Sequence, residues 1–359
     1  MTICVLIMAG GTGGHVFPAL AVAEELRKQN VEVFWMGTER GIEAKLVPAA
    51  DIPISYISVQ GLRGNGALGW LLAPFKVVKA VFEAMSAIRK IKPDVVMGLG
   101  GFASGPGGVA AKLMAKPLVI HEQNAIPGLT NKCLARLAKV VMEGFPNSFA
   151  DNINSQWVGN PVRSEIEQIA APVQRYSSRT GAIRLLVLGG SLGARALNTL
   201  IPQALALIDE AQRPEVKHQC GQRHYDDCIE SYQQAGVASN VSAFIDDMAA
   251  EYEWADMVIC RAGALTVAEL SAVGLPAILV PYPYAVDDHQ THNAAALVKV
   301  GGAKLIQENA LTAQSLANEI QTMTQDRQQL LTMASAARTQ AKNGTAQVIS
   351  SVCQELAHG

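Results

Sequence analysis

Short runs of apolar and β-branched residues alternate with stretches of helical periodicity along the whole chain. Residues 3–9 (ICVLIMA) are the first such run, and the glycine cluster 10–14 follows at once. The helical stretch beyond it has Leu20, Ala23 and Leu26 spaced for one face. A strand, a glycine turn and a helix in this order predict the opening of a Rossmann-like βαβ unit.

The same scheme recurs in the second half of the chain. Residues 183–188 (IRLLVL) form an apolar run, the glycine loop 189–193 follows, and Leu197, Leu200 and Ile201 then mark a helix. We therefore expect two doubly wound α/β domains in tandem. The pattern predicts further buried strands at residues 31–35, 94–97, 118–121 and 140–142 in the first half and at 241–244, 257–260 and 277–280 in the second.

A turn at 159–161 (GNP) predicts the linker between the domains. It gives an N-terminal domain at residues 1–162 and a C-terminal domain at residues 163–342. The last helix, about residues 343–359, carries one apolar stripe, with which it can pack back on the first domain or on the second.

The composition fits this picture and excludes several classes of protein. The chain has 359 residues, of which 49% are apolar and 17% charged, so it is neither disordered nor a coiled coil and has room for two cores. Residues 1–162 carry a net charge of +4 and residues 163–359 carry −6, so neither half has the dense basic face of a nucleic-acid binder. This difference in charge between the two halves is either ordinary variation or a feature that orients the protein toward a charged partner.

The cysteines and the apolar stretches indicate the compartment. Six cysteines are scattered without a C-x-x-C pair, which is typical of free thiols in a reducing compartment. The N-terminus lacks the basic region of a signal peptide. The uncharged stretches 95–111 and 270–286 are shorter than the ~20 residues of a membrane span. We expect a cytoplasmic protein that is not integral to a membrane.

The glycine loops indicate an anionic ligand. Glycines let backbone N–H groups and a positive helix end approach a ligand, so loop 189–193 is a candidate diphosphate cradle, the alternative being a tight turn that binds nothing. No Walker A pattern is present. Residues 98–103 fit a loose G-x-G-x-x-A, but no acidic residue ends a strand ~20 residues later, which disfavours an NAD-dependent dehydrogenase. The chain also lacks a D-x-D motif, so neither a metal nor another cofactor is expected.

Polar residues gather where the predicted strands end. His15 closes the first glycine loop, and 121–124 (HEQN) follow a strand. Residues 261–266 (RAGALT) follow another, with Glu269 one helical turn beyond, and 287–290 (DDHQ) follow a third. Ligands of doubly wound folds bind at the carboxyl ends of strands, so these clusters predict one ligand cleft.

With these segments in order, the chain resembles the MurG family of bacterial glycosyltransferases nearly from end to end. The segments that carry the resemblance are GGTGGHVFPALAVA (10–23), GLRG (61–64), GGFASGPGG (100–108), HEQNAIPGLTNK (121–132), GNPVR (159–163), GGSLGAR (189–195), FIDDM (244–248), RAGALTVAE (261–269) and DDHQTHNA (287–294). The resemblance implies a GT-B fold of glycosyltransferase family 28, in which two Rossmann-like doubly wound domains face each other across a cleft. It implies transfer of N-acetylglucosamine from UDP-N-acetylglucosamine to a lipid-linked N-acetylmuramyl-pentapeptide in peptidoglycan synthesis.

The resemblance also implies a donor site. Its residues would be Thr12, Gly13, Gly14, Asn124, Arg163, Ser191, Ile245, Ala264, Leu265, Thr266, Val267, Ala268, Glu269 and Gln290. Ser191 and its neighbouring amides would contact the diphosphate, and Arg163 and the backbone of Ile245 would lie at the uridine. Glu269 would accept the ribose hydroxyls, and Gln290 would bind the sugar hydroxyls.

One position departs from the family. Leu192 stands where the family's glycine loop has Gln, so no side-chain contact is expected there, whereas the backbone contacts are unaffected.

The implied reaction inverts the sugar: the C4 hydroxyl of the muramyl sugar attacks C1 of N-acetylglucosamine, and UDP leaves. His15 is the candidate base, because an imidazole titrates near neutral pH. The alternative is a histidine that orients the loop or binds the acceptor. With no metal motif, the helix N-terminus after Gly193 and the Thr266 hydroxyl are the candidates to stabilise the leaving diphosphate.

A lipid-linked acceptor requires access to a membrane. Residues 66–92 have a local net charge of +4, and their apolar residues include Leu68, Trp70, Leu71, Leu72, Phe75, Val78 and Phe82. Such a stretch can lie on an anionic membrane surface, and the alternative is a packed helix with a solvated basic face. We expect a peripheral protein on the cytoplasmic face of the bacterial plasma membrane, where cell-wall and division proteins are candidate partners.

Three other functions stay open at this stage. They are a different GT-B enzyme of UDP-sugars (a lipid glucosyltransferase or an epimerase), a nucleotide-sugar-binding protein without activity, and the disfavoured dehydrogenase. His15, Glu269 and Gln290 argue against a loss of activity.

Overall fold

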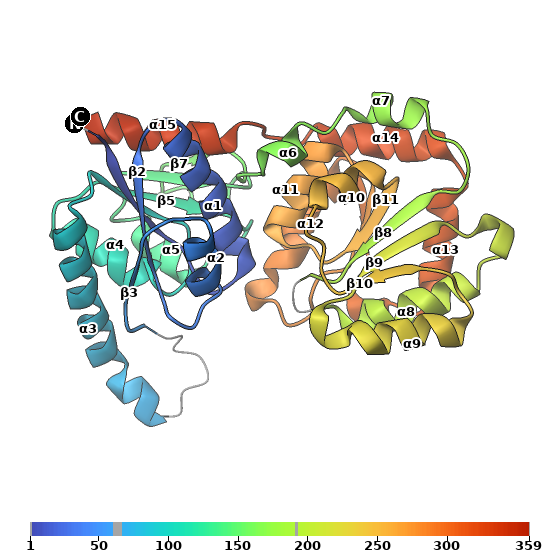
Figure 1. Cartoon of the computed structure of the whole chain (residues 1–359), viewed down its shortest axis with the longest axis horizontal. Helices are drawn as coiled ribbons and strands as arrows, with labels where there is room; N and C mark the ends of the chain where they lie inside the picture. The colour runs from blue at the N-terminus through green and yellow to red at the C-terminus, as the bar shows by residue number, and fades with distance from the viewer. Residues whose placement is uncertain (1, 60–66, 191–192, 359) are drawn as a thin grey trace. The chain divides into compact units, whose positions relative to one another are not determined.

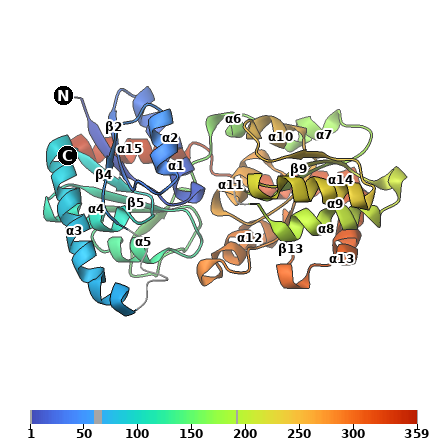
Figure 2. The same ribbon diagram turned by 60° about the horizontal axis from the view of Figure 1, so that its bottom comes forward.

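The computed structural model describes residues 2–59, 67–190 and 193–358, with residues 67–73 described by their backbone alone. Its contacts divide the chain into two compact units. Unit 1 comprises Met1–Arg163 and Asn343–Gly359, and unit 2 comprises Ser164–Lys342. Each unit is a parallel sheet covered by helices (Figure 1 and Figure 2), which confirms the predicted α/β class with two Rossmann-like domains.

The described part of unit 1 contains a seven-stranded parallel sheet in the order β3-β2-β1-β4-β5-β6-β7. The strands are β1 (Cys4–Met8), β2 (Glu32–Gly37), β3 (Ile54–Tyr56), β4 (Val95–Gly98), β5 (Leu118–Glu122), β6 (Val140–Glu143) and β7 (Ser155–Trp157). Successive residues of β1 point to opposite faces, so Val5 and Ile7 enter one core while Leu6 and Met8 enter another. Both faces are therefore buried, which explains the unbroken apolar run in the sequence.

Helices cover both faces of this sheet. They are α1 (Gly13–Lys28), α2 (Glu43–Ala49), α3 (Ala67–Ile91), α4 (Ser104–Leu113), α5 (Leu129–Leu134) and α15 (Thr345–His358). α15 packs against α1, with Ile349 and Cys353 fully buried, and the Thr345 hydroxyl donates to the carbonyl of Val158 (2.8 Å). The last helix of the chain is thus part of the same core as the first strand.

The described part of unit 2 contains a six-stranded parallel sheet in the order β10-β9-β8-β11-β12-β13. Its strands are β8 (Arg184–Leu188), β9 (Glu215–Gln219), β10 (Asn240–Ser242), β11 (Met257–Cys260), β12 (Ala277–Leu279) and β13 (Ala303–Leu305). Its helices are α6 (Ser164–Glu167), α7 (Pro172–Ser177), α8 (Arg195–Ala206), α9 (Tyr225–Ala235), α10 (Met248–Trp254), α11 (Ala264–Val273), α12 (His289–Lys299), α13 (Ala313–Thr324) and α14 (Arg327–Arg338).

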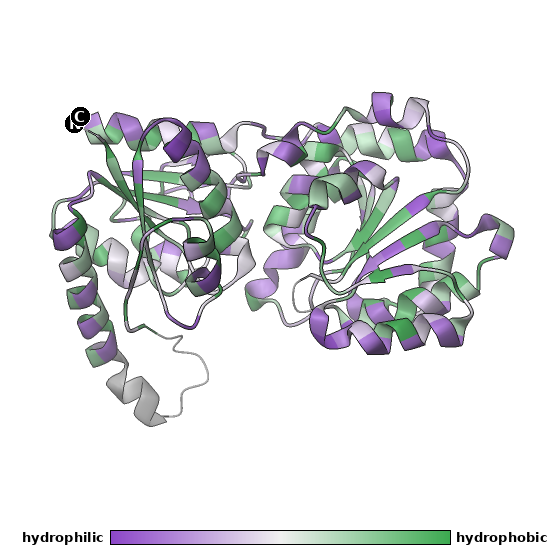
Figure 3. Cartoon of the chain, viewed as in Figure 1, coloured by the Kyte–Doolittle hydropathy of each residue, from purple (hydrophilic) through white to green (hydrophobic). Residues whose placement is uncertain are grey.

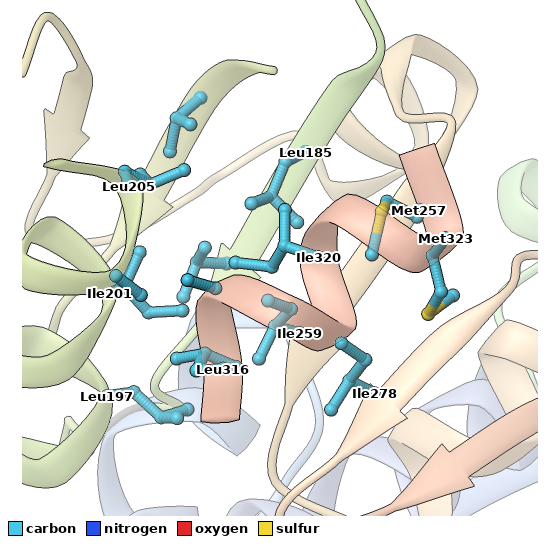
Figure 4. Close-up of a cluster of buried hydrophobic side chains, with 14 of the residues drawn as sticks. Leu185, Leu197, Ile201, Leu205, Met257, Ile259, Ile278, Leu316, Ile320 and Met323 are labelled. Carbon is cyan, nitrogen blue, oxygen red and sulfur yellow. The ribbon is translucent and has the colours of Figure 1, made fainter. Parts of the chain in front are cut away.

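The core of unit 2 joins helices to the middle of its sheet. α13 contributes Leu316 and Ile320, which pack with Leu185 of β8 and Ile259 of β11 (Figure 4). All four of these side chains are fully buried. Burying one such side chain contributes about 1.5–3 kcal/mol, so this layer holds α13 firmly on the sheet.

Two general properties follow from the described residues. None of the described helices has the length and apolar character needed to cross a membrane. All six cysteines lie within the described ranges and are free thiols, and Cys133 is the exposed one.

Candidate functional site

Three loops of unit 1 leave the carboxyl edge of its sheet, after the neighbouring strands β1, β4 and β5. A Cβ on Gly101 would overlap the carbonyl oxygen of Gly10, and a Cβ on Gly100 would overlap the His15 ring. Both Gly100 and Gly101 also have positive φ (100° and 84°), which L residues rarely adopt. Glycine at these positions therefore lets the β4 loop lie directly against the β1 loop and His15.

His15 lies in the first turn of α1. Its Nδ1 is 3.1 Å from the hydroxyl of Thr12, the residue that precedes the helix. His15 is half-buried, while Thr12 and Gly14 are exposed. An imidazole at the positive end of a helix can assist a reaction in which a hydroxyl loses its proton next to an anion.

Glu43, at the start of α2, holds the glycine loop after β1 in place. The sequence did not predict this residue as part of the site. The side chain is fully buried. Its Oε2 accepts a hydrogen bond from the amide of Gly11 (2.9 Å), and its Oε1 accepts from the amide and the hydroxyl of Thr38 (3.0 and 2.8 Å). The carboxylate thereby connects the glycine loop after β1 to the end of β2.

Glu122 organises the loop after β5. Its Oε1 accepts from the backbone and side-chain amides of Asn124 (2.9 and 3.2 Å). Its Oε2 accepts from the amide of Gly128 (3.1 Å) and from Asn131 Nδ2 (2.9 Å). The predicted ligand Asn124 is thus a half-buried residue at the carboxyl edge, held in place by a buried carboxylate.

The neighbouring His121 differs from the prediction that its polar cluster lines a ligand cleft. It is fully buried, and its Nε2 donates to the carbonyl of Gly159 (2.8 Å). Nδ1 is therefore the acceptor for Gln123 Nε2 (3.1 Å). Burial lowers the pKa of His121 to about 4, so this imidazole is a neutral part of the core.

The glycine loop of unit 2 follows β8. Gly190 and Gly193 have φ of +79° and +78°. Two residues of this loop lie outside the described residues: Ser191, the predicted diphosphate contact, and Leu192, which differs from the Gln of the family. The structure therefore describes the two ends of the loop.

The predicted segment Ala264–Glu269 forms the first turns of α11, which follows β11. The side chains of Ala264 and Val267 are buried, so only their backbones can reach a ligand. Leu265, Thr266 and Ala268 are half-buried. Glu269 is half-buried too, and its Oε2 accepts from the hydroxyl of Tyr252 (2.9 Å).

Of the remaining predicted residues, two lie at the carboxyl edge of the sheet of unit 2, and Arg163 lies where the sequence passes from unit 1 to unit 2. Ile245 is half-buried between β10 and α10. Gln290 is half-buried in the first turn of α12, where its Oε1 accepts from the amide of Tyr282 (2.8 Å). Arg163, which the sequence assigns to the second domain, is the last residue of the first segment of unit 1.

The structure thus brings Thr12, Gly13, Gly14, His15 and Asn124 to the carboxyl edge of one sheet. It brings Ile245, Ala264–Glu269 and Gln290 to the carboxyl edge of the other. Within the described ranges, no cluster of three His, Cys, Asp or Glu residues could hold a metal ion.

Comparisons with known proteins place this arrangement. The family model described as glycosyltransferase family 28 N-terminal domain matches residues 5–143, and the one for the family 28 C-terminal domain matches residues 184–349. A curated protein of Nitrosococcus oceani is 54% identical over 359 residues, covering 100% of both chains, and one of Marinobacter nauticus is 52% identical over 354 residues, covering 99% and 98%. Both are named UDP-N-acetylglucosamine–N-acetylmuramyl-(pentapeptide) pyrophosphoryl-undecaprenol N-acetylglucosamine transferase.

A solved structure agrees with these relatives. The crystal structure of Acinetobacter baumannii MurG is 42% identical and superposes with a TM-score of 0.84, covering 98% of this chain and 99% of that one. Two Rossmann-like units with ligand-type loops after their strands define a glycosyltransferase of the GT-B class. The chain belongs to glycosyltransferase family 28, in the group typified by MurG.

Proposed function

We propose that this enzyme transfers N-acetylglucosamine from UDP-N-acetylglucosamine to the C4 hydroxyl of the lipid-linked N-acetylmuramyl-pentapeptide. The observation that carries the proposal is full-length identity above 50% to transferases whose names state this donor and this acceptor. The GT-B fold and the half-buried polar residues at both carboxyl edges support it.

The donor is bound, on this proposal, mainly by unit 2. Ser191 and the N-terminus of α11 are the proposed contacts of the diphosphate. Glu269 is a carboxylate for the ribose hydroxyls, and its bond from Tyr252 fixes its orientation. Gln290 binds the hydroxyls of the sugar. Its Oε1 accepts from the Tyr282 amide, and its Nε2 can donate to the sugar.

His15 is the proposed general base. When Nδ1–H donates to the Thr12 hydroxyl, the lone pair lies on Nε2, which can accept the proton of the acceptor hydroxyl. The oxygen then attacks C1, the bond from C1 to the diphosphate breaks, and UDP leaves with the electron pair. The positive ends of helices offset the charge that develops on the diphosphate.

One assay tests the activity and the base together. The purified enzyme is incubated with UDP-N-acetylglucosamine and a short-chain lipid-linked muramyl-pentapeptide, and UDP release and the disaccharide are measured. The His15→Ala variant is expected to lose at least about a hundredfold in turnover and still to bind UDP. The exposed His358 supplies a matched control, because His358→Ala should leave turnover unchanged. Unchanged turnover of His15→Ala would remove His15 from the role of base.

The acceptor is lipid-linked, so we also propose that the enzyme binds the anionic cytoplasmic face of the plasma membrane through α3. Leu68, Trp70, Leu71 and Leu72 of the predicted patch lie outside the described side chains. Figure 3 shows green and purple positions mixed along the described part of α3. There Phe75, Val78 and Phe82 are 74%, 53% and 66% exposed, and Lys76 and Lys79 are exposed among them. Exposed apolar side chains beside lysines match the interfacial zone of an anionic bilayer.

Vesicle sedimentation tests this surface. The double variant Phe75→Ser/Phe82→Ser is expected to bind anionic vesicles at least about fivefold more weakly than the parent enzyme. The control is Val173→Ser/Leu207→Ser, which changes two exposed apolar residues of unit 2. Equal binding of the parent and the α3 variant would exclude this surface as the membrane contact.

A further inference from the structure

Gln219 is a buried polar residue whose place in the sheet of unit 2 is unusual. It ends β9, which lies between β8 and β10 (Figure 1), and only 5% of it is exposed. Its neighbours across the sheet are Leu188 of β8 and Ser242 of β10. The loops that leave these two strands therefore start on either side of Gln219.

The side chain of Gln219 is bonded to both loops. Its Oε1 accepts from the amide of Gly190 (3.1 Å), and its Nε2 donates to the carbonyl of Gly190 (3.0 Å) and to that of Ala243 (3.1 Å). Its backbone carbonyl accepts from the amide of Gly189 (2.8 Å). Both side-chain N–H groups and the oxygen are thus engaged, and no other side chain of this size offers two donors and one acceptor in one plane.

These bonds fix the first half of the glycine loop. Gly190 has a φ of +79°, and its own amide and carbonyl are both engaged by Gln219. The carbonyl of Gly190 also accepts from the amide of Gly193, which closes the loop (2.9 Å). Gln219 therefore fixes the start of the loop, where the chain leaves β8.

The second loop leads to the proposed uridine contact. Ala243, the other partner of Gln219, lies two residues before Ile245, whose backbone is proposed to meet the base. A uridine diphosphate has its base at one end and its diphosphate at the other. Both loops must therefore keep a fixed separation if one ligand is to contact them at the same time.

We propose that Gln219 is a positioning residue for the donor: it holds the diphosphate loop and the base-contacting segment at the separation that a uridine diphosphate spans. This inference rests on the donor site of the proposed function and adds a residue to it. Gln219 does not touch the ligand on this proposal and acts through Gly190 and Ala243. We call the hydrogen bonds of Gln219 to Gly190 and Ala243 the clamp. Its loss should weaken the binding of ligands that contact both loops more than the binding of ligands that contact one.

Calorimetric titration of the full-length enzyme with UDP, and separately with uridine, tests this difference. Gln219→Met keeps the length of the side chain and removes its donors, and Gln219→Glu keeps the acceptor but turns a carboxylate toward two carbonyl oxygens. Both variants are expected to bind UDP about tenfold more weakly, the size of one or two lost hydrogen bonds. Uridine affinity should change less than about threefold, and the KM for the donor should rise more than kcat falls. Gln203→Glu, on the exposed side of α8, is the matched control.

Three outcomes would overturn the inference. UDP affinity within twofold of the parent enzyme would show that the clamp does not matter. Equal weakening of UDP and uridine would indicate a general structural role. Failure of the parent enzyme to bind UDP at all would overturn the donor site itself, and the inference with it.

A measurement on the unchanged enzyme guards against variants that do not fold. The geometry requires the Gly190 amide to be protected from hydrogen exchange before any ligand is added, because Gln219 Oε1 accepts from it. Protection supports the clamp, and exchange at the rate of an open loop would refute it without any substitution.

Discussion

The buried carboxylate of Glu43 offers the sharpest test of how the first glycine loop is held. In Glu43→Gln one oxygen becomes an NH2 group, which must face either the Gly11 amide or the Thr38 amide. The better arrangement keeps the oxygen on Thr38, whose amide and hydroxyl both donate to it. The Gly11 amide then faces another donor, and one hydrogen bond to a charged group is lost.

The magnitude follows from that count. A hydrogen bond to a charged group contributes about 1.5–3 kcal/mol. We therefore expect Glu43→Gln to lower the free energy of unfolding of unit 1 by about 2 kcal/mol. Glu43→Ala leaves the two buried donors of Thr38 and the half-buried amide of Gly11 without an acceptor and adds a cavity, so its cost should reach about 4–5 kcal/mol. Turnover should fall by about tenfold or more in Glu43→Gln, because Gly11 lies four residues before His15 and small displacements at a reacting group are costly.

Urea unfolding followed by tryptophan fluorescence measures the first effect. Trp35 is a reporter for unit 1, since its indole is buried and donates to the carbonyl of Ala9 (2.9 Å). Glu24→Gln is the control, because Glu24 is an exposed partner of Lys28 on α1 and its loss should cost less than about 1 kcal/mol. If Glu43→Gln and Glu24→Gln unfold at the same urea concentration, the carboxylate does not hold the loop and this reasoning is wrong.

Two further predictions concern stability. Burial lowers the pKa of His121 to about 4 and that of His218 to about 3, against 6.5 for an ordinary histidine. Below pH 6.5 these two histidines take up protons in the unfolded chain but not in the folded one. Their contribution to the free energy of unfolding is therefore fully present above pH 6.5 and is lost as the pH falls toward 4. For His121 alone the loss at pH 4 is about 3 kcal/mol. Urea midpoints measured between pH 7.5 and 4.5 check this, and a constant midpoint would contradict it. Ala115, exposed after α4, has a φ of +53°, so Ala115→Gly should raise the melting temperature by relieving about 1 kcal/mol of strain. Ala206→Gly, at the right-handed end of α8, should lower it instead.

The strands that the sequence predicts are mainly buried strands made of apolar residues. β1 and β8 have unbroken apolar runs because both faces of a parallel sheet are covered. β9 reads EVKHQ and was not predicted, although its last two residues are buried. Their polar groups are bonded inside the fold, as with Gln219, and this compensation appears only in three dimensions. The edge strands β3 and β13 were not predicted either, because they are only partly buried and have no unbroken apolar run.

The site residues divide along the same physical line. Motif order and strand ends lead to His15, Asn124 and Gln290, because chemistry at the carboxyl edge of a doubly wound sheet requires such side chains there. Glu43 and Gln219 escape this reasoning. Glu43 is 32 positions from its partner Gly11, and Gln219 is 29 positions from Gly190. Only the register of neighbouring strands brings these pairs together, so no local spacing in the sequence could reveal them.

The position of α15 has a consequence for how the chain is made. Synthesis proceeds from the N-terminus, so the surface of α1 that α15 covers stays open until residues 345–358 have been made, after all of unit 2. Unit 2 is continuous in sequence and can fold as soon as it has been made, whereas unit 1 is completed only by a segment that follows unit 2. A stop codon that removes residues 343–359 would thus damage the half of the protein that is translated first.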